Sequence, residues 1–493
     1  MTTFKQTLLL FIIIIVEGYV VLSTELLAIR QTIPYVGSGT DTVSVIIAAV
    51  LMPLAFGYQN GGRFKPHKFF GMFLTIRKKL IFNILVASII LLVGMSYQSV
   101  QIFFVDILPN MGVYDRIVQI TLYTLIFLVV PVYLLGQTVP LISNFFSKKK
   151  LSSITGKMLF FSTVGSFLGA VFSTLVLMST IGVHHTVSLN FVLLAILVIM
   201  LSRHKLSKSV ILSVGIALIA MVFNSDFIMR GYAVREYNEY NRIQTTEKDG
   251  KRFLFLNRNA SSMYTDEGNK FDYIEFAERL LIEPIKDSPT PRDILIIGSG
   301  GFTFGHNYTR NNFTYIDIDE DLLAVAERYI LKEPLQPNKT FVPRPARAFL
   351  NETDQKFDVI YLDAYLGGAS IPEHLVTEDF FREVKARLKD GGALMSNMIL
   401  SPHFNNAFSR NIDNTFRAIF PHVSRHVIPR QNTLDNDRDT AKDPDNYNLW
   451  SESEGLLVNV AYIYKHHDDY DLGSIYTDNK NTVFIDKPKK FEP

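Results

Sequence analysis

Six residues in the second half of the chain could do chemistry, because each stands just after an apolar segment: Gly298, Gly300, Gly301, Asp317, Asp319 and Asp363. Glycines after a strand let a ligand approach the backbone, and an acid at the end of the next strand accepts hydrogen bonds from ribose hydroxyls. The carboxyl ends of parallel strands line the ligand crevice of an open sheet. The pattern therefore indicates a nucleoside site, with Asp363 at the end of a third strand.

Each of these signals also has a purely structural explanation. A glycine cluster after a strand is often only a turn. A lone acid such as Asp363 is also a common helix cap or turn former. Three such strand ends in succession favour a binding site over three separate structural explanations.

Strands must alternate with helices to bring these ends to one edge of a sheet. Apolar runs predict four strands and two helices: strands at 293–298, 313–318, 357–362 and 392–398, and helices at 319–331 and 377–388. This order predicts an α/β domain over 285–493 with a doubly wound parallel sheet of Rossmann-like form. The polar segment 429–453 is expected to be a mobile loop.

A small β-hairpin subdomain with a connecting helix is expected over 225–284. The dipeptide Asp249-Gly250 separates two runs of alternating residues, which is a good hairpin signal. Apolar residues then recur at helical spacing from about 271 to 284.

The first half of the chain, 1–224, is predicted to be a multi-pass helical membrane domain. Long apolar runs predict seven spans: 7–28, 43–59, 80–98, 117–136, 158–181, 187–202 and 208–224. Placing Glu17 and Glu25 at membrane depth costs free energy, so each is a candidate functional residue. We favour a structural role, in which Glu25 pairs with Arg30 and Glu17 bonds to a neighbouring helix.

Loop charges predict an orientation. Basic residues concentrate in the loops 60–79, 144–158 and 202–208, so the positive-inside rule places these loops and the N-terminus in the cytoplasm. Seven spans then place the second half of the chain on the far side of the membrane. If the short segment 208–224 lies in the interface instead, the second half is cytoplasmic.

Composition and the remaining polar clusters narrow the possible classes. The net charge is +2, so bulk charge does not indicate nucleic acid, and the absence of cysteine excludes disulfides and thiolate sites. His184 and His185 are adjacent and would point to different faces of a helix, so we expect a loop there and no metal site. His466 and His467 are expected in a solvated run. We predict no metal cofactor.

The order of six segments resembles the spermidine synthase family. They are Ile-Ile-Gly-Ser-Gly-Gly (296–301), Tyr-Ile-Asp-Ile-Asp-Glu-Asp (315–321), Arg-Ala-Phe-Leu (347–350), Phe-Asp-Val-Ile-Tyr-Leu-Asp (357–363), Leu-Val-Thr-Glu-Asp-Phe-Phe (375–381) and Leu-Lys-Asp-Gly-Gly (388–392). The resemblance covers about 235–400, with a weaker echo at 476–479. The first half looks like the multi-pass segment fused to some bacterial members.

The resemblance implies an aminopropyltransferase on the class I methyltransferase fold. The donor would be decarboxylated S-adenosylmethionine, and a small amine would attack the propyl carbon beside its sulfur. Asp363 then matches the catalytic carboxylate and Tyr273 an active-site tyrosine. Asp317 matches the ribose-binding acid, and Asn241 stands where a donor-contacting glutamine is usual.

Four positions depart from the family pattern. Gly301 stands where the glycine loop of the family has an acid. Pro345 replaces the family's acid that binds the adenine amino group. Leu366 replaces the second acid of an Asp-x-x-Asp pair, and Ile274 replaces a histidine or glutamine. Lost carboxylates remove partners for the cationic nitrogens of a polyamine. We therefore expect this chain to retain the family's donor site more fully than its ability to synthesise spermidine.

Three functions remain open. The first is a membrane-anchored aminopropyltransferase-like enzyme, and the second is a methyltransferase that uses intact S-adenosylmethionine on the same fold. The third is a membrane protein that moves or binds a small solute beside a degenerate, non-catalytic domain, for which Glu17 is the distinctive residue. We expect the protein to lie in the bacterial inner membrane. The expected partners are a small amine, the lipid bilayer and a second copy of the chain, and we expect no binding to nucleic acid. Loop charges favour the outside for the second half, and donor supply favours the cytoplasm.

Overall fold

The computed structural model describes most of the chain. The described residues are 4–69, 72–146, 151–365, 371–421, 423–428 and 458–464. Leu366 and three of the predicted features lie outside them: the loop 429–453, the histidines at 466 and 467, and the echo at 476–479.

The chain divides into two compact units, Met1–Glu239 and Tyr240–Pro493. The division falls within the segment 225–284 that the sequence assigns to a hairpin subdomain. The residues just after 224 therefore fold with the helical unit, and the hairpin itself folds with the second unit.

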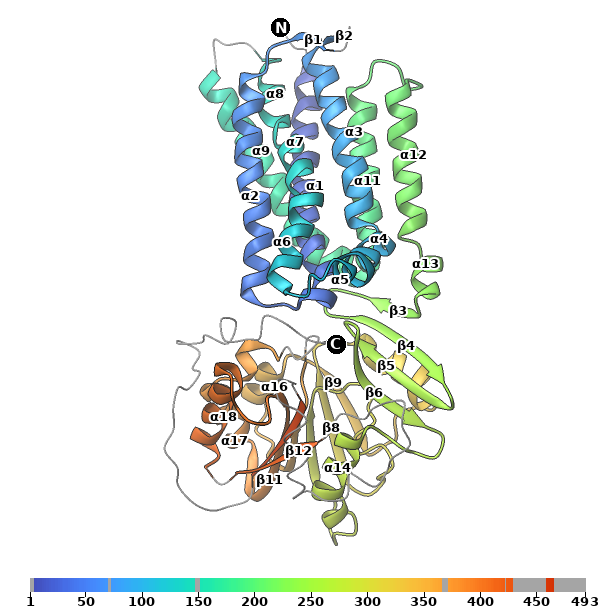
Figure 1. Ribbon diagram of the computed structural model, residues 1–493, viewed down its shortest axis with the longest axis vertical. Helices are drawn as coiled ribbons and strands as arrows, with labels where there is room; N and C mark the ends of the chain where they lie inside the picture. Colours follow the sequence, from blue (N-terminus) through green and yellow to red (C-terminus); the bar gives the residue numbers. More distant parts are fainter. Residues whose placement is uncertain are drawn as a thin grey trace. The chain divides into compact units, whose positions relative to one another are not determined.

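Six helical segments in the described part of the first unit are long and apolar enough to cross a membrane. Their helices run side by side (Figure 1): α1 (Phe4–Val36), α2 (Thr40–Arg63), α3 (Ile76–Met95), α9 (Leu151–Phe172), α11 (Gly182–Leu201) and α12 (Lys208–Phe223). The segment that includes α12 continues to Gly231, so it has 24 residues. The last predicted span is thus longer than its apolar core suggests.

The predicted span 117–136 is a broken helix. It consists of α6 (Arg116–Phe127), α7 (Val129–Gly136) and α8 (Thr138–Ser143). The axis bends by 42° after Phe127, and the described chain has up to seven candidate spans if this pair crosses as one.

Short elements connect these helices or follow the last of them. They are β1 (His67–Phe69), β2 (Met72–Leu74), α4 (Tyr97–Ile102), η1 (Phe103–Ile107), α5 (Leu108–Asn110), η3 (Ser173–Leu177), α10 (Met178–Thr180), α13 (Asp226–Gly231) and β3 (Val234–Tyr237). The labels η1 and η3 mark five-residue π-helical turns that continue a helix.

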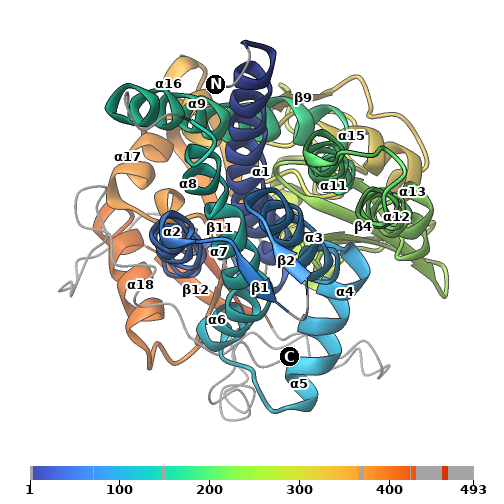
Figure 2. The ribbon, with the colours of Figure 1, turned by 90° about the horizontal axis from the view of Figure 1, so that it is seen from above.

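Helix α1 packs closely against α9 and α11, and Figure 2 shows these helices from above. Glycine permits the contact with α9: a Cβ on Gly165 would lie 2.1 Å from the Ile15 carbonyl oxygen, and one on Gly169 would lie 2.3 Å from that of Tyr19. Arg30 of α1, predicted to pair with Glu25, donates from Nε to the Asn238 carbonyl at 2.8 Å. Its guanidinium also lies over the Tyr237 ring.

The second unit contains a seven-stranded sheet in the order β12-β13-β11-β10-β7-β8-β9. The strands are β7 (Asp293–Ile297), β8 (Asn312–Asp317), β9 (Lys339–Pro343), β10 (Phe357–Leu362), β11 (Leu388–Leu400), β12 (Val423–Ile428) and β13 (Val458–Tyr464). From β9 to β11 the neighbours are parallel.

The prediction of a parallel sheet is wrong at its far edge. Strand β13 lies between β11 and β12 and runs antiparallel to both, so the sheet is mixed. A parallel neighbour requires a crossover, whereas an antiparallel strand can enter between two others without one. The segments that form β12 and β13 were not assigned as strands from the sequence. The result is the Rossmann-like methyltransferase fold with a mixed sheet.

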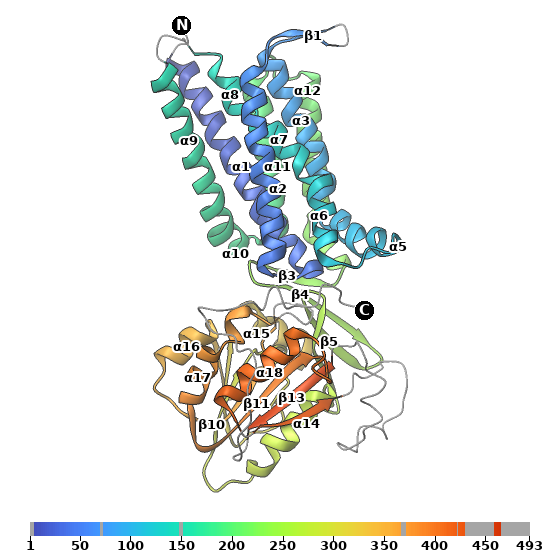
Figure 3. The same ribbon diagram turned by 60° about the vertical axis from the view of Figure 1, so that its left-hand side comes forward.

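Helices cover both faces of this sheet. Residues of β7 alternate between two cores, with Leu295 and Ile297 in one and Ile294 and Ile296 in the other. The first core also contains side chains of α16 (Ala346–Glu352), α17 (Glu378–Ala386) and α18 (Ala407–Ile419), which lie over one face (Figure 3). The second contains side chains of α14 (Asp272–Leu281), α15 (Asp321–Val325) and the π-turn η5 (Ala326–Leu331). The short 3₁₀ turns are η4 (Glu283–Ile285) and η6 (Glu373–Leu375).

The predicted hairpin is confirmed. Strands β4 (Arg242–Lys248) and β5 (Lys251–Leu256) are antiparallel, and β6 (Asn259–Thr265) continues the sheet. The turn residues Asp249 and Gly250 have φ angles of +52° and +72°. Positive φ at both positions is what a tight two-residue hairpin requires.

Candidate active site at the carboxyl ends of the strands

The glycine turn after β7 ties three strand ends together. Gly298 has a φ of +93°, and a Cβ there would lie 2.2 Å from the carbonyl oxygen of Asp363. Its amide donates to the Ile316 carbonyl of β8 at 2.9 Å, while the Asp363 amide donates to the Ile297 carbonyl at 2.8 Å. Only glycine fits this position, and its fit sets Asp363 beside the end of β7.

The rest of the turn packs against the small sheet. A Cβ on Gly300 or Gly301 would lie 2.9 Å from atoms of Ser262 in β6. The Gly301 amide donates to the Ser262 hydroxyl at 2.8 Å. Strand β6 of the hairpin subdomain therefore packs against the glycine turn. No pattern in the sequence predicted this contact.

Asp317 lies at the end of β8, where its carboxylate faces the glycine turn. It accepts hydrogen bonds from the amides of Ser299 at 3.0 Å and Asp319 at 3.2 Å. Burial raises the pKa of Asp317, and these amide donors counteract part of that rise. The Ser299 hydroxyl beside it is buried and has no hydrogen-bond partner among the described residues. A polar ligand could supply that partner.

Asp319 and Asn241 form an enclosed polar network. Asp319 is fully buried, and its two carboxylate oxygens accept from the Asn241 side chain at 2.8 Å and the Asp321 amide at 3.2 Å. The Asn241 side-chain oxygen in turn accepts from the Asn257 side chain at 2.9 Å. The network therefore links the end of β8 to the start of β4.

Asp363 follows β10 and is half-buried. Its Oδ1 accepts from the Asn397 side chain at 2.9 Å, and the Tyr361 hydroxyl lies 3.4 Å from Oδ2. Burial raises the pKa of Asp363 to about 7, despite the lowering effect of Asn397, Tyr361 and Tyr273. No ion pair to Asp363 occurs in the described part of the chain. A carboxyl group of this kind can both bind and release a proton at neutral pH.

Tyrosine hydroxyls surround this carboxylate. Tyr273 in α14 donates to the Ser261 carbonyl at 3.0 Å. Burial and the Asp363 charge raise the pKa of Tyr273 above its usual value, so the hydroxyl stays protonated. Tyr365 donates to the Asn397 carbonyl at 2.9 Å and accepts from the Ile399 amide at 2.8 Å, which fixes the end of β11.

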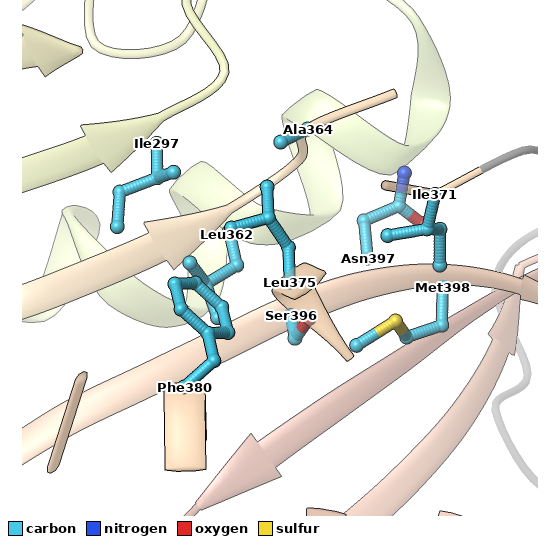
Figure 4. Close-up of a pocket in the computed structure, with 9 residues that line it drawn as sticks. All are labelled: Ile297, Leu362, Ala364, Ile371, Leu375, Phe380, Ser396, Asn397 and Met398. Carbon is cyan, nitrogen blue, oxygen red and sulfur yellow. The ribbon is translucent and has the colours of Figure 1, made fainter. Parts of the chain in front are cut away.

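A small cavity of about 20 Å³ is lined by Ala364, the residue after Asp363, and by Asn397, which bonds to Asp363 (Figure 4). It is lined by Ile297, Leu362, Ala364, Ile371, Leu375, Phe380, Ser396, Asn397 and Met398. The Ser396 hydroxyl and the Asn397 side-chain oxygen are buried and have no hydrogen-bond partner among the described residues. The walls are otherwise apolar. Asn397 thus holds Asp363 with its amide nitrogen and presents an unpaired oxygen on the other side.

The structure brings together most of the predicted site residues. Asp363, Tyr273 and the glycine turn converge, Asp317 lies beside the turn, and Asn241 reaches the same region through Asp319. Of the departing positions, Pro345 precedes α16 just after β9, and Ile274 is buried in the core.

Sequence reasoning missed Asn397, Tyr365 and Ser262. The signal for Asn397 was available, since it is a polar residue, next to Ser396, within the largely apolar run 393–400. The Ser262 contact depends on a chain separation of 39 residues and has no local signature.

Part of the chain is similar to known proteins. Residues 276–432 match the spermine/spermidine synthase domain family. The chain is 28% identical over 205 residues to the polyamine aminopropyltransferase of Vibrio vulnificus, a match that covers 40% of this chain and 64% of that protein. It therefore spans less than two thirds of that relative.

A second relative and a solved structure are also similar to part of the chain. Polyamine aminopropyltransferase 1 of Aquifex aeolicus is 29% identical over 202 residues, covering 38% of this chain and 69% of that protein. A probable spermidine synthase from Corynebacterium glutamicum superimposes with a TM-score of 0.37 at 18% identity, over 47% of this chain and 80% of that one.

Proposed function

We propose, from the premise that this chain is a spermidine synthase-like family member with a spermine/spermidine synthase domain over 276–432, that it is an aminopropyltransferase. It would transfer an aminopropyl group from decarboxylated S-adenosylmethionine to a small amine. The observation that carries the proposal is Asp363, a half-buried carboxylate beside the glycine turn whose pKa burial raises to about 7. General base catalysis is most effective when the base titrates near the working pH.

The donor's nucleoside is proposed to lie on the turn Gly298–Gly301. Asp317 has acceptor capacity left on both carboxylate oxygens after its two amide bonds, which suits ribose hydroxyls. The buried, unpaired Ser299 hydroxyl adds a further polar contact from the described part of the turn. Asp319 and Asn241 act as positioning residues, because both are buried and bonded to each other, whereas Asp317 is partly exposed.

The proposed chemistry is a displacement at the propyl carbon beside the sulfonium. The amine nitrogen forms a bond to that carbon as the carbon–sulfur bond breaks, and the electron pair leaves with sulfur. Asp363 orients the amine through its carboxylate and accepts the proton that the nitrogen loses. Asn397 and the surrounding tyrosines hold Asp363 in place, so that reacting groups meet in one orientation.

The acceptor is proposed to carry fewer positive charges than a polyamine. Gly301 offers no carboxylate at the turn, and Ile274 is packed in the core. A desolvated cationic nitrogen without an acidic partner costs several kcal/mol. A monoamine or a neutral-tailed amine would avoid that cost.

Methyl transfer from intact S-adenosylmethionine is the competing reaction, and the missing acceptor acids leave room for it. Product mass spectrometry with each donor and a panel of amines separates the two. We expect a product heavier by one aminopropyl group with the decarboxylated donor and at least one amine. Methylated product from the intact donor alone would overturn the proposal, as would no product with any amine in protein that binds donor.

The first unit is proposed to anchor the enzyme by spanning the inner membrane seven times, with the bent pair α6–α7 as one span. A solute-binding role for this unit has one supporting observation, since Glu17 is buried and its Oε2 has no partner among the described residues. Cellular phenotypes of Asp363→Asn and Glu17→Gln distinguish these roles. Loss of the phenotype in Glu17→Gln alone would favour solute binding over catalysis.

A further inference from the structure

Two histidines and an aspartate converge at one end of the helical unit. His184 and His185 lie in the first turn of α11, and Asp226 is the first residue of α13. The Nε2 atoms of His184 and His185 lie 2.9 Å and 3.1 Å from the same oxygen, Oδ1 of Asp226. Among the residues that the structure describes, this is the one group of three such side chains whose ligand atoms all lie within 4.8 Å of one another.

The expectation that these histidines lie in a loop is wrong, and so is its premise that adjacent histidines in a helix would point apart. They are helical, but helix side chains lean toward the N-terminus, so two imidazoles in a first turn can both reach a group placed beyond the helix start. Their ring centroids are 4.2 Å apart. Gly182 opens the helix with a φ of +80°, and a Cβ there would lie 3.0 Å from Cε1 of His184. Glycine at 182 therefore leaves space for the imidazole ring of His184.

We propose that His184, His185 and Asp226 bind a divalent cation of the zinc class. Two imidazole nitrogens and a carboxylate oxygen are ligands that zinc prefers, whereas magnesium and calcium prefer oxygen alone. The His184 side chain is 11% exposed, against 42% for His185 and 60% for Asp226. The site is thus anchored on a buried ring and open on one side, where water can complete a four-coordinate shell.

Simple hydrogen bonding is the alternative explanation, in which both rings donate from Nε2 to Asp226. Both Nε2–H groups would then donate to one carboxylate oxygen, which can accept two hydrogen bonds, so zinc binding is the property that separates the two explanations. A metal would bind the bare Nε2 atoms and move each ring proton to Nδ1. The bound ion would join the first turn of α11 to α13, a role separate from the transferase chemistry.

Zinc binding to the full chain in detergent micelles tests the proposal. After chelator treatment and its removal, calorimetry with Zn²⁺ alone should show one ion per chain, with no competition from excess Mg²⁺. The variants His185→Ala and Asp226→Asn should each weaken binding by about 10-fold or more. Both side chains are largely exposed, so these changes spare the helix packing. His204→Ala removes another exposed histidine of the same unit and should leave the affinity unchanged.

Two further measurements complete the test. Zinc should raise the apparent melting temperature of the wild-type chain and of His204→Ala, but not of the two site variants. X-ray absorption of the zinc-loaded chain should show imidazole nitrogen ligands. The proposal fails if the wild type does not bind zinc, if the site variants bind it as tightly as the control, or if the absorption spectrum shows oxygen ligands alone.

Discussion

Strand β10 carries one acid near its start and another just past its end, and the two have opposite surroundings. Asp358 bonds to Lys389 at 2.7 Å and to Arg292 at 3.0 Å, and it accepts from the Asp293 amide at 2.9 Å. Asp363 contacts an amide and tyrosine hydroxyls, and forms no ion pair among the described residues.

The surroundings move the two pKa values in opposite directions. Burial alone would raise the pKa of Asp358, but its bonds to Lys389, Asp293 and Arg292 hold it below its usual value. Burial raises the pKa of Asp363 from 3.8 to about 7, because no cation offsets the loss of solvent. Asp358, near the start of β10, therefore forms ion pairs within the fold. Asp363, just past its end, is an acid that can exchange a proton near neutral pH.

The largest expected difference is in turnover. Asp363→Asn should lower kcat/KM by about 10²- to 10⁴-fold, since it removes the group proposed to take the proton. Asp358→Asn should keep turnover within a few-fold of wild type. The measurement is the rate of product formation under matched conditions. Equal losses in both variants would show that the two ends do not differ in function.

The glycine turn offers the next comparison. Gly298→Ala places a Cβ against the Asp363 backbone and strains a left-handed residue, whereas Gly391→Ala adds strain alone because nothing lies within 4 Å. The strain costs about 1–3 kcal/mol at either site, and the overlap at 298 adds to it. Thermal unfolding of the full chain should show the lower melting temperature for Gly298→Ala. A larger loss in Gly391→Ala would contradict the packing described for the turn.

Stability should respond to the two acids with opposite sign. The folded state keeps a proton on Asp363 that the unfolded chain releases, so this group lowers stability as pH rises from about 4 to 7. Asp363→Asn should therefore raise the melting temperature at pH 8, and the gain should shrink toward pH 4. Asp358 has a depressed pKa, so its contribution is present above 3.8 and is lost as pH falls through the folded value. Asp358→Asn should lower the melting temperature at pH 8.

The smallest expected effect is a shift of a pH profile. Asn397→Ala removes a hydrogen bond that favours the charged form of Asp363. Such a bond is worth about 1.5–3 kcal/mol, so the midpoint of kcat/KM should rise by about one to two pH units with the same acceptor. Ser396→Ala is the matched control in the same cavity wall and should leave the midpoint unchanged. A fall of the midpoint in Asn397→Ala would contradict the assigned contact.

The part of the site that follows strand ends could be predicted from the sequence. Gly298, Asp317 and Asp363 each close an apolar run, and parallel strands bring such ends to one edge. The hairpin at Asp249-Gly250 also had a local signal, since two positive φ angles require such residues.

The remainder depends on contacts between distant segments. Ser262 supports the glycine turn across 39 residues, and Asn397 meets Asp363 across 34. Asp319 looked like a second ligand group, but its side chain is fully buried and bonded to Asn241, which only the fold reveals. Strand β13 pairs with β11 from a chain position that pattern alone does not assign.

The central claim is that Asp363 is a carboxyl group without a cationic partner that titrates near neutral pH. The most direct test is an infrared titration of the full chain, taken as the difference between wild type and Asp363→Asn. We predict one protonated carboxyl signal that disappears in the wild type as pH rises through about 7. A difference signal that is already lost near pH 4 would show an ordinary, solvated or paired acid and would contradict the account.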